Sequence, residues 1–350
     1  MTYAGRVTHV QRAMGAKQNY VTAYYGSQAL TSFPLSVMRE IDAANAYVDL
    51  TAGGGGMVYH QADKYGKRVG YNDRCYYAYL GMSAVLEPAW DLDQPVTDWF
   101  EDFGRKTHPD NVQRLSLGNG YLSKLDTKAA KISDELRRYI DSLCVWFNQD
   151  ALVLSTVGRV IVNNFTFRAF SWCGSDPSRK KVSDWSPEDF WTKMMRAAMR
   201  ARAFSNRLVP SPHEVLWGDA KHAAYEMNVE GALVYSDPAW PWADTGPNPY
   251  EWFHYDLSGI LLQEDLPEIR FWQRGDFDNI VRETAEWGTL VLERDARGFI
   301  LSTQGTNAPV PEEVFRAVGE HIPLKWTDVV TAQSLGAAKP FTEHFAMFAG

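Results

Sequence analysis

The sequence predicts an α/β protein built on a doubly wound, mostly parallel sheet, with a helical segment inserted between two of its strands. Three observations lead to this fold class. A glycine-rich turn joins an apolar segment to a helix-like one near the N-terminus, a long basic stretch interrupts the alternation of strands and helices, and an apolar, strand-like segment resumes near residue 232. A strand, a glycine turn, a helix and a second strand are the typical opening of such a domain.

Length and composition set the limits of this fold. The chain has 350 residues, of which 45% are hydrophobic, enough for a sizeable core and two lobes. Three scattered cysteines are too few for a disulfide framework or a zinc motif, which agrees with a reducing cytoplasm. No stretch has the character of a signal peptide or reaches the ~18 apolar residues of a membrane helix. We therefore expect a cytoplasmic protein without a membrane partner and without a metal.

Charge is distributed unevenly along the chain. The net charge is −8, yet residues 91–207 hold 18 basic and 15 acidic side chains, or +3, which leaves −11 for the rest. Residues 159–207 alone hold 10 basic and 4 acidic side chains, or +6. Such asymmetry favours a segment that faces nucleic acid, and an ordinary solvated surface explains it about equally well.

The first strand is expected over residues 46–50 (AYVDL), followed by the turn TAGGGG (51–56) and a helix. The segment KRVGYND (67–73) is typical of a second strand, which ends in Asp73, 20 residues after Gly53. Glycines let the backbone approach a ligand closely, and the N-terminus of the following helix is positive. An acid at this spacing suits the hydroxyl pair of a ribose.

The residues around the glycine turn distinguish between nucleotide cofactors. The dinucleotide fingerprint G-x-G-x-x-G needs a third glycine where this chain has Val58. Asp49, just before the turn, would repel a pyrophosphate. It suits a cationic ligand such as S-adenosylmethionine (SAM), which carries a sulfonium, an ammonium and a ribose. A glycine turn that only shapes the backbone is the structural alternative.

A strand-like segment over residues 232–235 leads into Asp237, Pro238, Ala239 and Trp240. Open α/β sheets bind their ligands at the carboxyl ends of strands. The Asp237 carboxylate and the Pro238 carbonyl would place two acceptors side by side, which matches the two N–H donors of an exocyclic amine. Trp240 offers a flat face for a flipped base. An isolated Asp-Pro pair more often only opens a turn.

In this order, the glycine turn, the long insert and the Asp-Pro-x-aromatic motif resemble the SAM-dependent adenine-N6 methyltransferases of DNA, in the branch of the GATC-type enzymes. Six segments are similar to motifs of that family: AMGAK (13–17), DLTAGGGG (49–56), GYND (70–73), FTFRAFSW (165–172), VLWGDA (215–220) and NPYEWFHYDLSGIL (248–261). The resemblance covers about residues 13–288. The chain departs from the family at Ala239, where proline is usual, at Trp240, where tyrosine or phenylalanine is commoner, and at Thr51, where the family has an aromatic residue.

The resemblance implies a Rossmann-like SAM-dependent methyltransferase fold with a mixed sheet. It implies a catalytic domain over residues 1–90 and 208–350 and a mainly helical target-recognition insert over 91–207. The cofactor-binding residues that it implies are Gly15, Lys17, Asp49, Gly53, Gly55, Asp73 and Asp219. The catalytic residues that it implies are Asp237, Pro238 and Trp240.

The insert contains the clearest helix of the chain, over residues 186–207. Ser186 and Asp189 form a capping-box pattern, and Pro187 takes the first helical position. Apolar and basic residues fall on separate faces of this helix, which suits phosphate contacts as well as an ordinary solvated surface. The predicted DNA-binding residues are Arg168, Lys180, Lys181, Lys193, Arg196 and Arg200.

We expect direct methyl transfer to the N6 of a flipped adenine in double-stranded DNA. Cytosine-N4, RNA and free nucleotides also present an exocyclic amine and remain alternative substrates. A relative that binds nucleic acid without catalysis, with Ala239 as the lesion, is a second alternative. A nicotinamide-dependent oxidoreductase is a third, and it would leave the Asp-Pro motif unexplained.

Beyond residue 288 the α/β pattern continues. The segments TLVLERD (289–295) and GFILST (298–303) are predicted as strands, PEEVFRAVGEHI (311–322) as a helix and EHFAMFAG (343–350) as a final strand. We expect these elements to complete a mixed sheet with an antiparallel strand.

Overall fold

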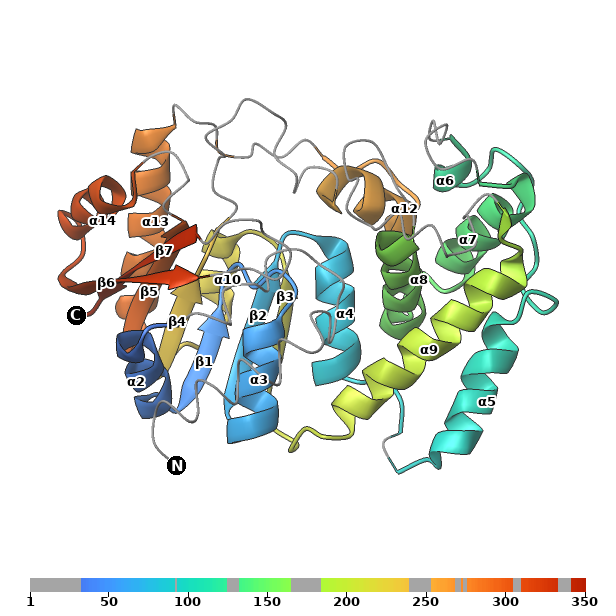
Figure 1. The fold of residues 1–350 in the computed structure, drawn as a ribbon, viewed down its shortest axis with the longest axis horizontal. Coiled ribbons are helices and arrows are strands. Elements are labelled where there is room, and N and C mark those ends of the chain that lie inside the picture. Colours follow the sequence, from blue (N-terminus) through green and yellow to red (C-terminus); the bar gives the residue numbers. More distant parts are fainter. Residues whose placement is uncertain are drawn as a thin grey trace.

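The structure is a computed structural model that describes residues 33–91, 93–124, 132–164, 184–238, 253–267, 272, 276–304, 310–332 and 341–350. It shows an α/β protein with a seven-stranded mixed sheet and helices on both faces of that sheet (Figure 1). The predicted fold class is confirmed at this level.

The sheet has the strand order β3-β2-β1-β4-β5-β7-β6. Its strands are β1 (Ala46–Asp49), β2 (Arg68–Asp73), β3 (Glu214–Trp217), β4 (Ala232–Ser236), β5 (Gly298–Gln304), β6 (Leu324–Ala332) and β7 (Phe341–Phe348). Strands β1 to β5 pair in parallel, whereas β7 runs antiparallel to both β5 and β6. The strand order reverses between β1 and β4, and such a switch point is where open α/β sheets bind ligands.

Two apolar clusters cover the two faces of the sheet. One cluster joins alternate strand residues such as Tyr47 and Tyr235 to the helices α2 (Leu35–Ala43), α3 (Gly56–Tyr65) and α4 (Tyr76–Leu86). The other joins Val48 and Val234 to α10 (Ala220–Glu226), α13 (Phe277–Leu292) and α14 (Pro311–Gly319). Because both faces are buried, β1 and β4 are apolar along most of their length instead of alternating.

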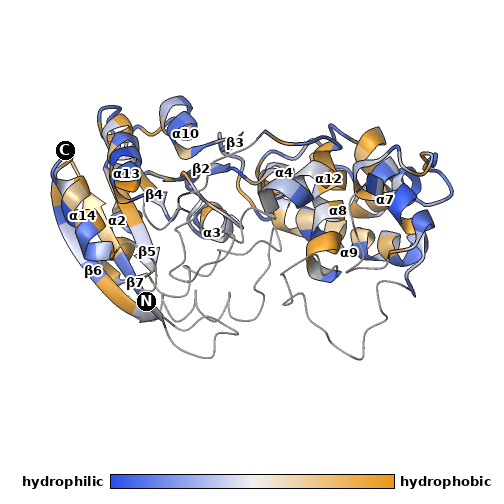
Figure 2. Cartoon of the chain, turned by 90° about the horizontal axis from the view of Figure 1, so that it is seen from above, coloured by the Kyte–Doolittle hydropathy of each residue, from blue (hydrophilic) through white to orange (hydrophobic). Residues whose placement is uncertain are grey.

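Five helices lie between α4 and β3 in the part of this segment that the structure describes. They are α5 (Val96–Thr107), α6 (Tyr121–Lys124), α7 (Asp134–Trp146), α8 (Ala151–Asn164) and α9 (Pro187–Ser205). Figures 1 and 2 show them beyond the β3 edge of the sheet, with α4 between the sheet and the inserted helices. Helix α4 packs against α8 and α9, and one apolar cluster runs through both parts. The two parts therefore share a core.

The chain returns to the inserted helices after β4. A π-helical turn (Phe253–Leu257) and α12 (Ser258–Leu262) pack against α4, and α12 also packs against α6, α7 and α8. Gln263, at the end of α12, accepts a hydrogen bond from the Tyr121 backbone N–H at 2.9 Å and donates to Asp141 at 3.1 Å. The segment that follows the Asp-Pro motif is thus attached to the insert.

Most predicted elements agree with the structure, one predicted strand is wrong, and one strand of the sheet was not predicted. The capping box of α9 is present, with the Asp189 backbone N–H 3.3 Å from the Ser186 hydroxyl. The strand predicted over 289–295 is wrong, because these residues form the end of α13 and the turn after it. A short apolar run fits either element, and the residues that precede it extend the helical pattern. Strand β6 was not predicted, because Val329 and other side chains on this edge strand are exposed.

Within the described ranges, no helix is long and apolar enough to cross a membrane.

Candidate functional site

Three predicted site residues lie at the carboxyl ends of neighbouring parallel strands, which we call the carboxyl edge of the sheet. Asp49 is the last residue of β1, Asp73 is the last residue of β2, and Asp237 follows β4 directly. The parallel register places Asp49 beside Tyr71 of β2 and Tyr235 of β4. The three carboxyl groups therefore gather at the carboxyl ends of neighbouring strands, next to the switch point.

The glycine turn after β1 has the shape that its sequence predicts. Gly53 and Gly55 adopt positive φ angles of 53° and 66°, a conformation that favours glycine. A Cβ atom on Gly55 would lie 2.3 Å from the sulfur of Met82 on α4, so no other residue fits there without displacement. The Tyr71 hydroxyl donates to the Gly53 carbonyl at 2.7 Å. The turn is thereby fixed against β2 and α4.

Asp73 holds this turn through its carboxylate. One oxygen accepts the Gly53 backbone N–H at 2.8 Å, and the other accepts the Cys75 backbone N–H at 2.7 Å. Burial raises the pKa of Asp73 to about 6, although the two N–H donors oppose that rise. The resemblance implies that Asp73 binds a ribose, whereas its contacts here connect the turn to the start of α4. Each carboxylate oxygen has two lone pairs, so a ribose hydroxyl can still donate to this group.

Asp49 is a buried acid next to other acids. It is 5% exposed, accepts the Thr51 backbone N–H at 3.1 Å and accepts the Tyr47 hydroxyl at 3.4 Å. Burial raises its pKa well above the usual range, and the charges of Asp237 and Asp73 add to the rise. A positive group bound at this edge would lower that pKa and stabilise the carboxylate.

The Asp237-Pro238 segment is attached to the glycine turn by Thr51. The Asp237 backbone N–H donates to the Thr51 hydroxyl at 2.8 Å, and the Ser236 hydroxyl lies 3.1 Å from the same oxygen. Asp237 is half-buried and Pro238 is buried. The sequence singled out Thr51 only as a departure from the family, and its link to Asp237 across 186 positions was not predicted.

Asp219 is placed by the end of β3. The Gly218 backbone N–H donates to the Asp73 carbonyl at 3.2 Å, so the ends of β2 and β3 are joined. The Asp219 carboxylate caps α10 by accepting the His222 backbone N–H at 2.9 Å, and Arg74 lies 3.9 Å away. Asp219, which the resemblance implies to bind the cofactor, is therefore at the same end of the strands and caps α10 in this structure.

Six predicted site residues lie outside the described ranges. They are Gly15, Lys17, Arg168, Lys180, Lys181 and Trp240. Among the residues that are described, no group of three or more His, Cys, Asp or Glu side chains has the arrangement of a metal site.

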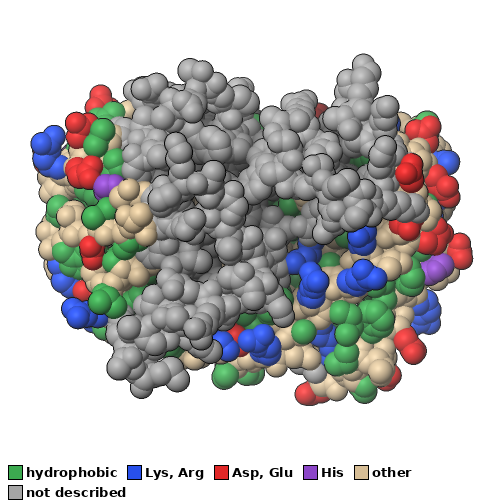
Figure 3. Space-filling view, in the orientation of Figure 1, with side chains coloured by type: hydrophobic (Ala, Val, Ile, Leu, Met, Phe, Trp, Pro, Cys, Tyr) green, Lys and Arg blue, Asp and Glu red, His purple; other side chains and the backbone are tan. Residues whose placement is uncertain are grey.

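The basic face predicted on α9 is present. Arg196 and Arg200 are exposed, whereas Phe190, Met194 and Ala197 on the other face are buried. Lys193 is half-buried, with its ammonium 4.9 Å from the ring centre of Trp185. Figure 3 shows Lys and Arg side chains gathered in the half of the molecule that holds α8 and α9.

Packed helices connect this basic face to the glycine turn. Helix α9 packs against α4 and α8, and α4 in turn packs against β2 and carries Met82, which lies beside Gly55. Helices α4 and α8 also pack closely against each other. Gly158 makes the approach possible, because a Cβ there would meet the Tyr77 ring at 2.4 Å. Helix α4 thus lies between α9 and the sheet, and one apolar core includes residues of all three.

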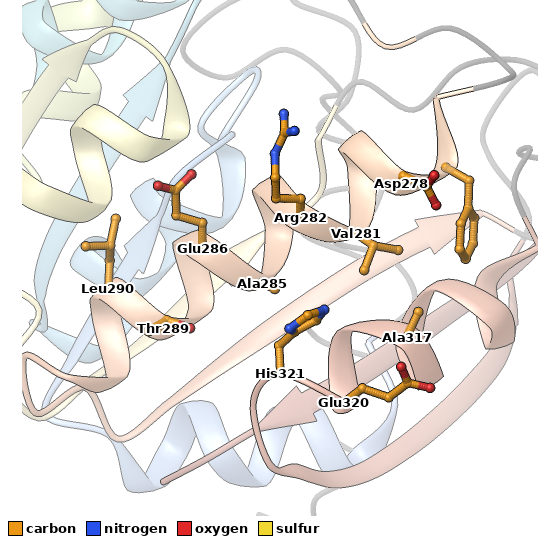
Figure 4. A pocket seen from close by; sticks show the side chains of 11 residues that line it. Asp278, Val281, Arg282, Ala285, Glu286, Thr289, Leu290, Ala317, Glu320 and His321 are labelled. Atoms are coloured by element: carbon orange, nitrogen blue, oxygen red, sulfur yellow. The ribbon is translucent and has the colours of Figure 1, made fainter.

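A surface groove of about 790 Å³ lies between α13 and α14, on the opposite face of the sheet from Asp49 and Asp237 (Figure 4). Its lining mixes charges of both signs, among them Arg282, Glu286 and Glu320. Glu286 forms an ion pair with Lys221 at 2.5 Å. Because the groove contains none of the predicted site residues, we place the candidate site at the carboxyl edge of the sheet.

Comparisons with known proteins give no family for this chain. No family model matches it, and no curated protein matches it.

Proposed function

We propose that this protein transfers a methyl group from SAM to the exocyclic N6 of adenine in DNA. The observation that carries the proposal is the hydrogen bond of 2.8 Å between the Asp237 N–H and the Thr51 hydroxyl. It joins a glycine turn suited to a nucleoside cofactor with an acceptor pair suited to an amine. Both lie at the switch point of a doubly wound sheet.

The carboxyl groups at the carboxyl edge of the sheet suit a cationic cofactor. Asp49 is buried beside the charges of Asp237 and Asp73, and an anionic pyrophosphate would add to their repulsion. A sulfonium or an ammonium would reduce it instead. Asp49 would hold the positive end of SAM, the turn at Gly53 and Gly55 would let the cofactor approach the backbone, and Asp73 would receive a ribose hydroxyl.

SAM would supply an electrophilic methyl group, and the protein's own groups would prepare the nucleophile. The Asp237 carboxylate and the Pro238 carbonyl would accept the two N–H bonds of the amine. Accepting both bonds directs the nitrogen lone pair away from the ring and toward the methyl group. Positioning and electrostatics then account for most of the rate enhancement, and no cysteine nucleophile is needed.

The remaining architecture supports the same proposal. The resemblance implies a mixed sheet with an antiparallel strand, and β7 is antiparallel between β5 and β6. Arg196 and Arg200 provide exposed cations on a helix that packs against α4. Cations of this kind suit the phosphates of DNA, which fix the position of a duplex without reading its sequence.

Nucleoside mass spectrometry tests the proposal. The protein is incubated with SAM and unmodified double-stranded DNA, with Asp237→Ala alongside as the matched control. N6-methyladenine from the wild type alone supports the proposal, and N4-methylcytosine would retain the mechanism with another base. If SAM binds and DNA stays unmodified, repeating the assay with RNA and with nucleotides distinguishes another substrate from a catalytically silent relative.

A further inference from the structure

We propose that Glu343 and Asp237 form one carboxyl pair of the site, which holds a single proton near neutral pH, with Glu343 as the protonated member. The sequence predicted Glu343 only as part of a final strand. Strand direction, burial, a hydrogen bond and the surrounding charges support the pair.

Strand direction explains why Glu343 reaches the site. Strands β4 and β5 end at the carboxyl edge, whereas the antiparallel β7 begins there. The register pairs Ser236 with Leu301 and Gln304 with Glu343. Ser302, the residue after Leu301, is therefore next to Asp237 across β4 and β5. The Ser302 hydroxyl donates to Glu343 at 2.9 Å, and β5, which carries Ser302, lies between the strands that lead to the two acids.

Glu343 is more deeply buried than any other acid at this edge. Its side chain is 1% exposed, and one carboxyl oxygen accepts from Ser302. The other oxygen, Oε2, is buried and has no hydrogen-bond partner in the part of the chain that the structure describes. A buried, incompletely bonded carboxylate is costly, and a proton on the group removes most of that cost.

The groups around Glu343 provide no positive charge among the described residues. Tyr235 lies on β4 and Asp237 directly follows that strand, and Asp328, on β6, accepts the Ser36 hydroxyl of α2 at 2.6 Å. His344 faces the opposite side of β7, where it lies 3.0 Å from Glu312 of α14. Of the charged groups that the structure describes, Asp237 is the one whose charge acts on Glu343.

The electrostatics of the site agree with this geometry. Burial raises the pKa of Glu343 to about 8, and the charge of Asp237 adds to the rise. A carboxyl group whose pKa is raised by folding stabilises the protein fully below its unfolded value of about 4.3. That stability is lost as the pH rises through the folded value of about 8.

The pair has a consequence for the reaction, which rests on the proposed function. As the N–C bond forms, the C–S bond breaks and its electron pair stays on sulfur. The amine nitrogen becomes positive and must lose one proton. Asp237 accepts this proton, and the pair, now doubly protonated, returns one proton to water. Glu343 thus keeps the charge of the acceptor site at −1 between turnovers.

A double-mutant cycle in stability tests the pair without SAM or DNA. Melting temperatures of the wild type, Glu343→Gln, Asp237→Asn and the double variant are measured at pH 5, 7 and 9. We expect Glu343→Gln to raise the melting temperature at pH 9 by about 2 °C or more, with little change at pH 5. The gain at pH 9 should be smaller in the Asp237→Asn background, because the repelling charge is absent there.

Glu312→Gln is the matched control, since Glu312 is an exposed acid that contacts β7 from the opposite face of the sheet. It should show no gain at pH 9. Equal gains from Glu343→Gln in both Asp237 backgrounds, or a loss of stability at pH 9, would overturn the proposal.

An infrared titration keeps the test decisive if Glu343→Gln does not fold. The wild type should show a buried carboxylic acid band that disappears as the pH rises through about 8. In Asp237→Asn this band should disappear at lower pH, and an unshifted band would contradict the pair. If these tests give the expected results and the protein methylates no DNA, the carboxyl pair is supported and the proposed function is wrong.

Discussion

The ionisable groups at the acidic carboxyl edge of the sheet are mostly buried, whereas those on the basic face of α9 are mostly exposed. Asp49 and Glu343 are nearly inaccessible and are bonded to neighbouring hydroxyl or N–H groups. Arg196 and Arg200 are exposed. Buried acids are held in one geometry at a cost in stability, whereas exposed cations act through a field that tolerates movement.

This difference indicates what each region can do. Buried groups with shifted pKa values concentrate at sites where geometry decides the chemistry. Exposed cations provide affinity that depends on salt and not on one fixed arrangement. We therefore expect substitutions at the edge to have large and specific effects and substitutions on α9 to have small and graded ones.

The largest expected effect is that of Asp237→Ala on methyl transfer. Removing the carboxylate leaves the amine with one acceptor, so the single-turnover rate should fall by about 10²-fold or more. SAM affinity, measured by calorimetry, should change little because Asp49 and the glycine turn remain. A variant that keeps its full rate would show that Asp237 has another role.

The next effect concerns stability and compares two glycines with left-handed backbones. Gly55→Ala combines a φ of 66° with a contact of 2.3 Å to Met82, and it should cost about 2–4 kcal/mol in urea unfolding. Gly66→Ala has a φ of 60° and open space around it, so it should cost only about 1 kcal/mol. Equal costs would show that the turn is not packed against α4 as described.

A smaller effect is expected at Thr51. Thr51→Val keeps the shape and removes the acceptor of the Asp237 N–H, so the transfer rate should fall by about tenfold, while SAM affinity is kept. Thr51→Ser keeps the hydroxyl and should recover most of the rate. If Thr51→Ser loses the rate and Thr51→Val keeps it, the methyl group and not the hydrogen bond matters.

The smallest effect is expected on α9. Arg196→Ala combined with Arg200→Ala should weaken DNA binding and lower the salt dependence of log K by about 1.8, for two lost phosphate contacts. Arg282→Ala on α13 removes an exposed cation elsewhere and should leave the slope unchanged. An unchanged slope in the double variant would place the DNA contacts on another surface.

Local sequence was enough to predict the elements that begin or end at strong signals. The glycine turn, the capping box of α9 and the apolar β1 and β4 all depend on neighbouring residues. The prediction for the end of α13 was wrong because TLVLERD fits a strand as well as a helix when it is taken alone. Strand β6 was not predicted because its pattern is weak at an exposed sheet edge.

The site was predictable where it follows strand order and unpredictable where it depends on pairing between distant strands. Asp49, Asp73 and Asp237 end parallel strands and so share one edge. Thr51 contributes through a hydrogen bond across 186 positions, and Glu343 contributes because β7 is antiparallel. Neither tertiary relation leaves a local signal in the sequence.

Equilibrium titration of SAM into the wild-type protein tests the central claim most directly, namely that the carboxyl edge is a site for this cationic cofactor. We expect saturable binding by the wild type, affinity about tenfold weaker in Asp49→Asn, and no binding of nicotinamide dinucleotides. A folded wild-type protein that does not bind SAM, or that binds a nicotinamide dinucleotide instead, would contradict the account.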